Sequence, residues 1–151
     1  FAQRWDGDAE DVPPAFGTVS LDIDGDSMDA VQLLDEAYGQ SWNAPALTPA
    51  DLQRTDVDTW FARRDDEICG VLVARRSGDS YWIGGLGTRP ELRGQGIGRA
   101  LLCNIMRIAA KQSHGVVLLV PSDNEAVLRW STGLGFWTYR SWAHYYRRQT
   151  S

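Results

Sequence analysis

The sequence is poor in residues that hold metals or form disulfides, with two cysteines and two histidines among 151 residues. Zinc sites need Cys and His ligands at short spacings, whereas His114 and His144 stand far apart, so we expect no metal. Cys69 and Cys103 both fall in apolar stretches, which is typical of buried free thiols, and nothing in the sequence demands a disulfide. Since disulfides are rare in the cytoplasm, we expect the chain to be cytoplasmic.

Long hydrophobic runs are also absent from the sequence. No apolar stretch approaches the ~18 residues of a membrane span, and we expect no membrane partner. The chain starts at Phe1 instead of a Met and shows no signal-peptide pattern, so we expect a trimmed chain or a piece of a longer protein. With 43% apolar and 23% charged residues, the composition is typical of one globular domain with a sizeable core.

Basic charge is scarce, because the formal net charge at pH 7 is -5. This balance argues against a nucleic-acid-binding module, and we expect no nucleic-acid partner. The charges are unevenly distributed: residues 1–40 contain ten acids and one Arg, whereas residues 89–111 contain five bases and one acid. A basic segment of this kind favours a polyphosphate ligand, although a solvated helix face would produce the same pattern.

The basic segment contains the hexapeptide Arg-Gly-Gln-Gly-Ile-Gly at residues 93–98, between a strand-like run and an amphipathic helix. Free N–H groups at a helix N-terminus bind phosphate, and glycine lets a ligand approach the backbone closely, although a plain tight turn would look similar. A nucleoside-triphosphate loop is excluded, because Arg99 and Ala100 replace its Lys and Ser/Thr. A dinucleotide-binding fingerprint is excluded by the spacing of the glycines and by the absence of a later acid.

The hexapeptide resembles the Arg/Gln-x-x-Gly-x-Gly/Ala segment of the GNAT superfamily of acyl-CoA-dependent N-acyltransferases, with Arg93, Gly96 and Gly98 on its defining positions. The preceding residues 86–92 resemble the strand and the connection that lead into this segment in the family. A second family motif follows in the expected order.

Residues 124–126 (Asn-Glu-Ala) and 134–136 (Leu-Gly-Phe) resemble that second motif, the Asn-x-x-Ala helix with its Leu-Gly-Phe ending. The Ala stands two instead of three places after the Asn, so the match is looser there. The resemblance covers residues 80–140 by motif and extends without motifs over residues 17–79. It implies an α/β (α+β) GNAT fold, in which a mixed, mostly antiparallel twisted sheet carries helices on both faces.

Apolar periodicity predicts the elements of such a fold. Alternating or continuous apolar runs predict strands over residues 19–23, 58–63, 68–75, 81–86, 116–120, 136–139 and 142–146, the last two as an antiparallel pair. Helical spacing predicts helices, counted with their caps, over residues 26–38, 48–52, 97–109 and 124–135. Residues 1–16 are expected to form an acidic tail or linker, and residues 17–151 a single acyltransferase domain. The pair Gly84-Gly85 predicts a β-bulge or a ligand approach, or else a simple kink.

The resemblance implies a binding site for acetyl-CoA as co-substrate. In the family the pantetheine arm lies in a gap beside the bulged strand, which implies that backbone near Leu86 and Thr88 holds it. The diphosphate would lie on the loop, so the remaining cofactor-binding residues are Arg93, Gly94, Gln95, Gly96, Ile97, Gly98, Arg99 and Asn124. Asn124 could equally be only a helix cap.

The acid that protonates the departing thiolate is less clear. Many family members place a Tyr five residues before the Phe of Leu-Gly-Phe, and here that position is Ser131. A Ser hydroxyl is a far poorer acid than a phenol of pKa ~10. Ser131 could relay a proton through water, Tyr139 could substitute, or the thiolate could leave without help. No carboxylate lies on the strand at 81–86, and we assign no general base.

The predicted function is direct transfer of an acetyl group from acetyl-CoA to a primary amine of a small molecule or peptide. The alternative is a non-catalytic acyl-CoA-binding regulatory domain of a longer protein. The aromatic residues Trp42, Trp60, Trp137 and Trp142 could line the acceptor site or belong to the core. A homodimer is compatible with either function.

Overall fold

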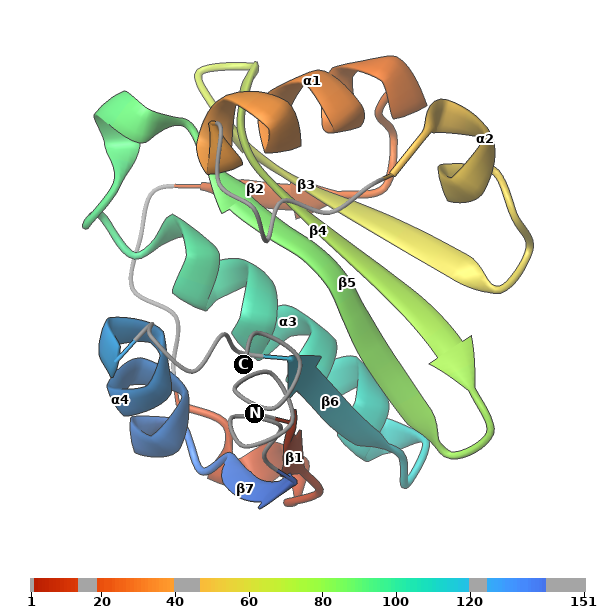
Figure 1. Cartoon of the computed structure of the whole chain (residues 1–151), viewed down its shortest axis with the longest axis vertical. Coiled ribbons are helices and arrows are strands. Elements are labelled where there is room, and N and C mark those ends of the chain that lie inside the picture. The colour runs from red at the N-terminus through yellow and green to blue at the C-terminus, as the bar shows by residue number, and fades with distance from the viewer. Residues whose placement is uncertain (1, 14–18, 40–46, 120–124, 141–151) are drawn as a thin grey trace, which may run out of the picture.

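The computed structural model describes residues 2–13, 19–39, 47–119 and 125–140, and every structural statement concerns these residues. They form a seven-stranded sheet in the order β2-β3-β4-β5-β6-β1-β7, with helices on both faces (Figure 1). All neighbouring strands are antiparallel except β5 and β6, which are parallel. The predicted mixed, mostly antiparallel sheet is therefore confirmed. The strands are β1 Ala2–Trp5, β2 Ser20–Asp22, β3 Val57–Arg64, β4 Glu67–Ser77, β5 Ser80–Thr88, β6 Gly115–Leu119 and β7 Trp137–Arg140.

The helices begin where the sequence places capping residues. The Asp26 side chain accepts a hydrogen bond from the Met28 amide at 2.7 Å, so Asp26 caps the first helix. Thr48 caps the second helix and Pro49 takes its first position, as the sequence predicts, and Asp51 completes a capping box with Thr48. The helices are α1 Ser27–Tyr38, α2 Pro49–Leu52, α3 Ile97–Lys111 and α4 Glu125–Gly133, with short 3₁₀ helices at Ala9–Asp11 and Pro90–Leu92.

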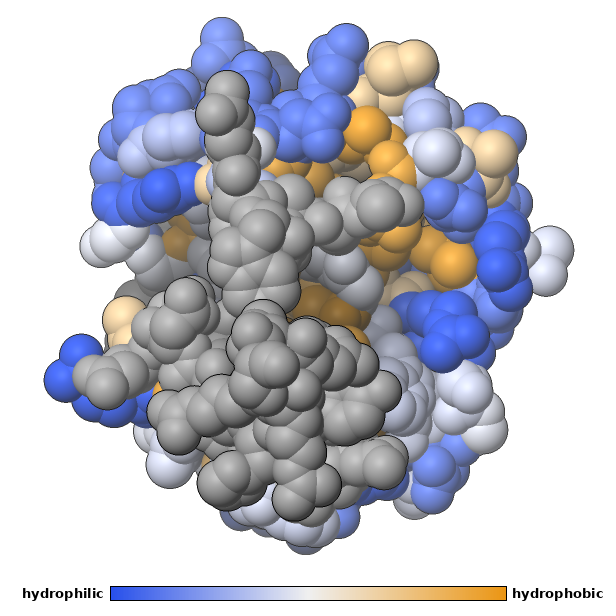
Figure 2. Space-filling view, viewed as in Figure 1, coloured by the Kyte–Doolittle hydropathy of each residue, from blue (hydrophilic) through white to orange (hydrophobic). Residues whose placement is uncertain are grey.

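Strand β4 divides the core into two clusters because its side chains alternate between the two faces of the sheet. Val71 and Val73 pack with Leu33 and Leu34 of α1 on one face. Leu72 and Ala74 face α3 and α4 on the other. Seen from the side of Figure 1, hydrophobic residues reach the surface over the strands below α1 and α2, while hydrophilic residues cover α1 (Figure 2).

The N-terminal residues correct one expectation. The predicted irregular tail over 1–16 is wrong for Ala2–Trp5, because this segment forms β1 between β6 and β7. Strand β7 therefore pairs with β1, and the predicted partner strand at 142–146 lies outside the described residues. The four residues of β1 carry no alternating pattern, so their strand state depends on partners more than 100 residues away. Trp5, at 3% exposure, fixes the strand in the core.

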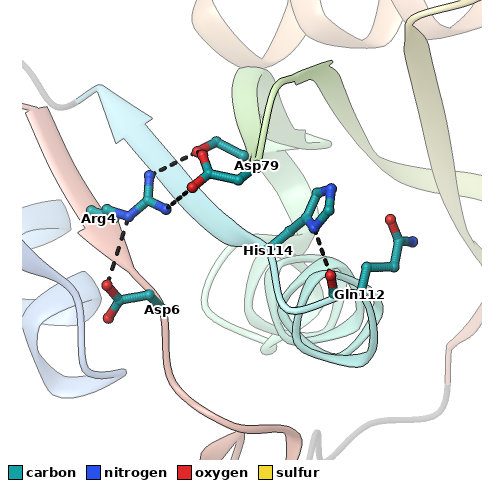
Figure 3. Close-up of polar contacts among 6 residues, drawn as sticks. Arg4, Asp6, Asp79, Gln112 and His114 are labelled. Carbon is teal, nitrogen blue, oxygen red and sulfur yellow. Dashed lines mark hydrogen bonds and ion pairs between the residues drawn. The ribbon is translucent and has the colours of Figure 1, made fainter.

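Arg4 ties β1 to the start of β5. Its guanidinium donates to the Ser80 hydroxyl at 2.7 Å and lies 3.7 Å from carboxylate oxygens of both Asp6 and Asp79 (Figure 3). Gly115 leaves room for it, since a Cβ there would lie 2.6 Å from an Arg4 nitrogen. Nearby, His114 Nδ1 lies 2.7 Å from the backbone oxygen of Gln112 at the end of α3. These contacts hold the closed end of the β5–β6 pair.

Helix α1 packs closely on β5 because β5 has glycines beneath it. A Cβ on Gly87 would lie 2.8 Å from the Ala37 Cβ, and one on Gly85 would lie 3.1 Å from a Leu34 methyl group. Side chains at these positions would push the helix off the strand. Gly84, in contrast, has only a backbone oxygen at 3.9 Å near its missing Cβ.

Replacing Gly87 with Ala should therefore lower the free energy of unfolding by about 1–3 kcal/mol, the usual cost of overpacking a core. Urea unfolding measures this directly. The matched control is Gly84→Ala on the same strand, which should stay within about 0.5 kcal/mol of the parent protein. Equal losses in both variants would show that α1 does not depend on the glycine at 87.

Candidate functional site

Strands β5 and β6 run side by side for only part of their length. Their pairing extends from Ser80 opposite Gly115 to Ile83 opposite Leu118. Among the described residues, the rest of β5, from Gly84 to Thr88, has no strand on that side, and the two strands diverge (Figure 1). A register shift opposite β4 coincides with this point, because Ala74 pairs with Ile83 while Val73 pairs with Gly85. The predicted bulge at Gly84-Gly85 is confirmed.

The bulge leaves an open edge of hydrogen-bonding groups. The Arg89 amide donates to the Cys69 carbonyl at 3.0 Å, and antiparallel ladders alternate between bonded and non-bonded pairs. Gly87 and Gly85 therefore face β4, whereas the backbone groups of Leu86 and Thr88 point to the opposite side. At this edge β6 no longer accompanies β5. The backbone groups of Leu86 and Thr88, the two β5 residues that the sequence singles out, thus point away from β4.

The glycine loop begins α3 directly after this edge. Gly94 and Gly96 both have φ of 81°, a left-handed conformation that glycine adopts without strain, and Gly96 is the N-cap. The first helical hydrogen bond joins the Ala100 amide to the Gly96 oxygen at 3.0 Å. Among the described residues, the amides of Ile97, Gly98 and Arg99 have no backbone acceptor, as expected of a first helical turn.

The loop and the open strand edge adjoin each other. A Cβ built on Gly98 would lie 3.8 Å from the Thr88 hydroxyl oxygen, so the start of α3 lies next to the end of β5. Gly94, Gln95 and Gly96 are exposed, whereas the Ile97 side chain is buried and anchors the helix in the core. The edge of β5 therefore adjoins a helix N-terminus, whose partial positive charge favours anions.

Several arginines surround the loop. Arg93 donates to the backbone oxygen of Ala37 in α1, which joins the loop to that helix. Arg99 lies on α3 with its Nε buried and without a hydrogen-bond partner in the described part of the chain. Arg64 at the end of β3 donates to the Gln95 side chain. The sequence analysis missed Arg64, because only the β3–β4 hairpin brings it to the loop and no local pattern announces that contact.

Ser131 does not lie at an open surface. Its side chain is fully buried, and its hydroxyl donates to the Gln3 side-chain oxygen and contacts the Leu128 backbone oxygen at 3.2 Å. Gln3 in turn donates to the Thr138 hydroxyl at 3.4 Å. This polar group therefore joins α4, β1 and β7 inside the core.

The structure describes only some of the remaining predicted site residues. Asn124, Trp42 and Trp142 lie outside the described residues, as does the side chain of Tyr139. Trp60 is partly buried against the cluster on the α3 face, and Trp137 is 49% exposed.

Both cysteines are free and buried, as the sequence predicts. Burial raises the pKa of the Cys69 and Cys103 thiols, so neither is a reactive thiolate. Within the described ranges, no group of His, Cys, Asp and Glu residues has the arrangement of a metal site. None of the helices described is both long and apolar enough to cross a bilayer.

A separate hollow of about 220 Å³ lies near the β2–β3 edge of the sheet, between α2, β3 and the connection from β2 to α1. Its walls are formed by Ile23, Gly25, Ser27, Leu52, Val57, Asp58, Thr59 and Phe61. None of the residues that line this hollow belongs to the loop or to β5.

The buried hydroxyl of Ser131 yields a stability prediction. Ser131→Ala should lower the free energy of unfolding by about 1–3 kcal/mol, because the Gln3 oxygen would lose its donor inside the core. Thr132→Ala, at the exposed neighbouring position, serves as the control and should change stability by less than about 0.5 kcal/mol. Chemical denaturation of both variants tests this, and an unchanged Ser131→Ala midpoint would contradict the buried network.

Comparison with known sequences supports one family. A model described as the Acetyltransferase (GNAT) family matches residues 28–136. Mycothiol acetyltransferase of Streptomyces scabiei (strain 87.22) is 30% identical over 148 residues, which cover 88% of this chain and 47% of that protein. The Kocuria rhizophila mycothiol acetyltransferase is 32% identical over 117 residues, 66% of this chain and 39% of that protein. The chain thus spans about half the length of these relatives or less.

Solved structures show the same fold at lower identity. A putative GNAT-family acetyltransferase from Novosphingobium aromaticivorans superposes with a TM-score of 0.73 at 19% identity, covering 92% of this chain and 59% of that one. The ribosomal-protein-S18-alanine N-acetyltransferase of Escherichia coli gives a TM-score of 0.71 at 18% identity, covering 81% and 79%. With the family model spanning well over half of its length, the chain belongs to the Acetyltransferase (GNAT) family.

Proposed function

We propose that this chain is an N-acetyltransferase that moves the acetyl group of acetyl-CoA directly to a primary amine. The observation that carries the proposal is that the edge of β5 at Leu86 and Thr88 adjoins the first turn of α3, whose amides have no backbone acceptor among the described residues. Family membership supports the same reaction. Because the chain spans about half of its curated relatives, this activity is proposed for the domain described.

The edge of β5 suits the pantetheine arm of CoA, and the start of α3 suits its diphosphate. The pantetheine arm carries amide groups, and these can add to the edge of β5 at Leu86 and Thr88 much as a further strand would. The diphosphate would lie on the amides of Gly94, Gln95, Gly96, Ile97, Gly98 and Arg99, where the helix dipole favours negative charge. Arg93, Arg99 and Arg64 add positive potential around the same loop.

Acetyl transfer needs positioning more than reactive side chains. The neutral amine attacks the thioester carbon, the new C–N bond forms, and the C–S bond breaks as the amine loses a proton and the CoA sulfur gains one. Fixing the thioester on backbone groups supplies much of the rate by proximity. Because the Ser131 hydroxyl already donates to Gln3, proton delivery through Ser131 would require that bond to break. We assign no general base.

The acceptor is proposed to be a cationic small-molecule amine. Exposed acids at the cap and along α1, namely Asp26, Asp29, Asp35 and Glu36, would attract a protonated amine before it loses its proton. The curated relatives carry the name of a small-molecule acetyltransferase, which favours a small acceptor over a peptide. Free thiols in the core support a cytoplasmic location.

The loop assignment is tested by Gly98→Val. Open space around Gly98 should let the fold survive, while the added side chain would occupy the diphosphate seat. We expect CoA affinity, measured by calorimetry, to fall at least tenfold, or about 1.4 kcal/mol. Gly133→Val, at the end of α4 where nothing lies within 4 Å of the missing Cβ, is the control and should bind CoA normally. Normal CoA binding by Gly98→Val would disprove the loop assignment.

Turnover separates the proposed enzyme from the alternative, a non-catalytic acyl-CoA-binding regulatory domain. The parent protein is incubated with acetyl-CoA and a panel of primary amines, and release of the free CoA thiol is followed. Amine-dependent release that disappears in Gly98→Val supports the enzyme. Tight CoA binding without release for any amine would leave the regulatory domain as the function.

A further inference from the structure

Helix α1 ends directly above the open edge of β5. Its last residue is Tyr38, followed by Gly39 as the C-cap. Ala37 lies over Gly87 and Leu34 lies over Gly85. The final turn of α1 therefore packs on the part of β5 beyond its pairing with β6. Tyr38 is half-buried among the residues that pack between α1 and the sheet.

The Tyr38 hydroxyl meets the Leu86 amide. The Leu86 N–H points away from β4, and the described residues of β6 end before they reach it. The Tyr38 hydroxyl faces this amide, which lowers the pKa of the phenol. Burial raises the pKa of the Tyr38 phenol, and the facing Leu86 amide offsets only part of this effect. The phenol therefore keeps its proton at neutral pH and stays a hydrogen-bond donor.

We propose that Tyr38 and the Leu86 amide together form a two-donor site for the oxygen of the acyl thioester. The inference rests on the proposed function and names a side chain for it. The Tyr38 hydroxyl lies on the side of β5 to which the Leu86 amide points. When the thioester oxygen takes that place, the phenol shifts aside and donates its own proton to the same oxygen. Two donors then stabilise the negative charge that develops there during attack.

Hydrogen-bond donation suits this phenol better than proton transfer does. An ordinary thiol has a pKa near ~8.5, below that of an ordinary phenol at ~10. Burial widens the gap, so transfer of the Tyr38 proton to a departing thiolate would run uphill. A phenol that only donates a hydrogen bond avoids this unfavourable proton transfer. Its role therefore differs from that of an acid that protonates the sulfur.

Isotope-edited infrared spectroscopy tests the two-donor site without knowledge of the acceptor amine. Acetyl-CoA carrying a ¹³C-labelled carbonyl is bound to the parent protein, to Tyr38→Phe and to Tyr81→Phe. We expect the carbonyl band of bound acetyl-CoA to lie at lower wavenumber in the parent protein than in solution. In Tyr38→Phe the band should move part of the way back toward its position in solution. Affinity for CoA without the acetyl group should be unchanged in Tyr38→Phe, because the acyl oxygen is the only part of acetyl-CoA that the phenol is proposed to contact.

Tyr81→Phe is the matched control, since the Tyr81 hydroxyl donates to Gln112 at the other end of β5. It should leave the band where the parent has it. A parent-like band in Tyr38→Phe, with acetyl-CoA bound, would overturn the inference and leave the proposed function intact. If the parent protein bound no acetyl-CoA, the proposed function and the inference would both fail. Tyr38→Phe keeps the aromatic ring, and urea unfolding verifies that it folds.

Discussion

The arrangement of the site depends on one interruption of backbone hydrogen bonding, the end of the β5–β6 ladder at Ile83. A buried strand edge without partners is costly, so the fold must supply substitutes or leave the edge to a ligand. The bulge at Gly84 turns β5 away, and the Tyr38 hydroxyl faces the Leu86 amide. After this divergence the chain continues into the glycine loop, and the N-terminus of α3 lies next to Thr88. The strand edge and the helix start therefore lie next to each other.

Because the site consists mainly of backbone groups, the residues that matter for it are neighbours that position this backbone. Glycines at 85 and 87 let α1 lie on β5, and buried Ile97 holds the start of α3 against β4. Arg93 and Arg64 connect the loop to α1 and β3. Solved structures with 18–19% identity superpose at TM-scores above 0.7, as expected when the shared feature is a path of the backbone and few side chains are required.

Local chemistry accounts for what the sequence could predict. The loop glycines, the Gly84-Gly85 bulge and the Thr48 cap each depend on residues within a few positions of one another. Strand β1 could not be predicted, because Gln3 and Trp5 owe their burial to strands from the far end of the chain. The placement of Arg64 beside Gln95, and of Ser131 against Gln3, likewise needs tertiary contacts that no local spacing encodes.

The central claim is that the free edge of β5 and the first turn of α3 together bind acetyl-CoA. Amide hydrogen exchange of the parent protein, with and without saturating acetyl-CoA, tests it most directly. The account predicts slower exchange over residues 84–99, at Leu86, Thr88 and the loop amides, because these N–H groups gain acceptors on the ligand. Protection confined to the hollow around Thr59, or absent from residues 84–99 despite saturation, would contradict it.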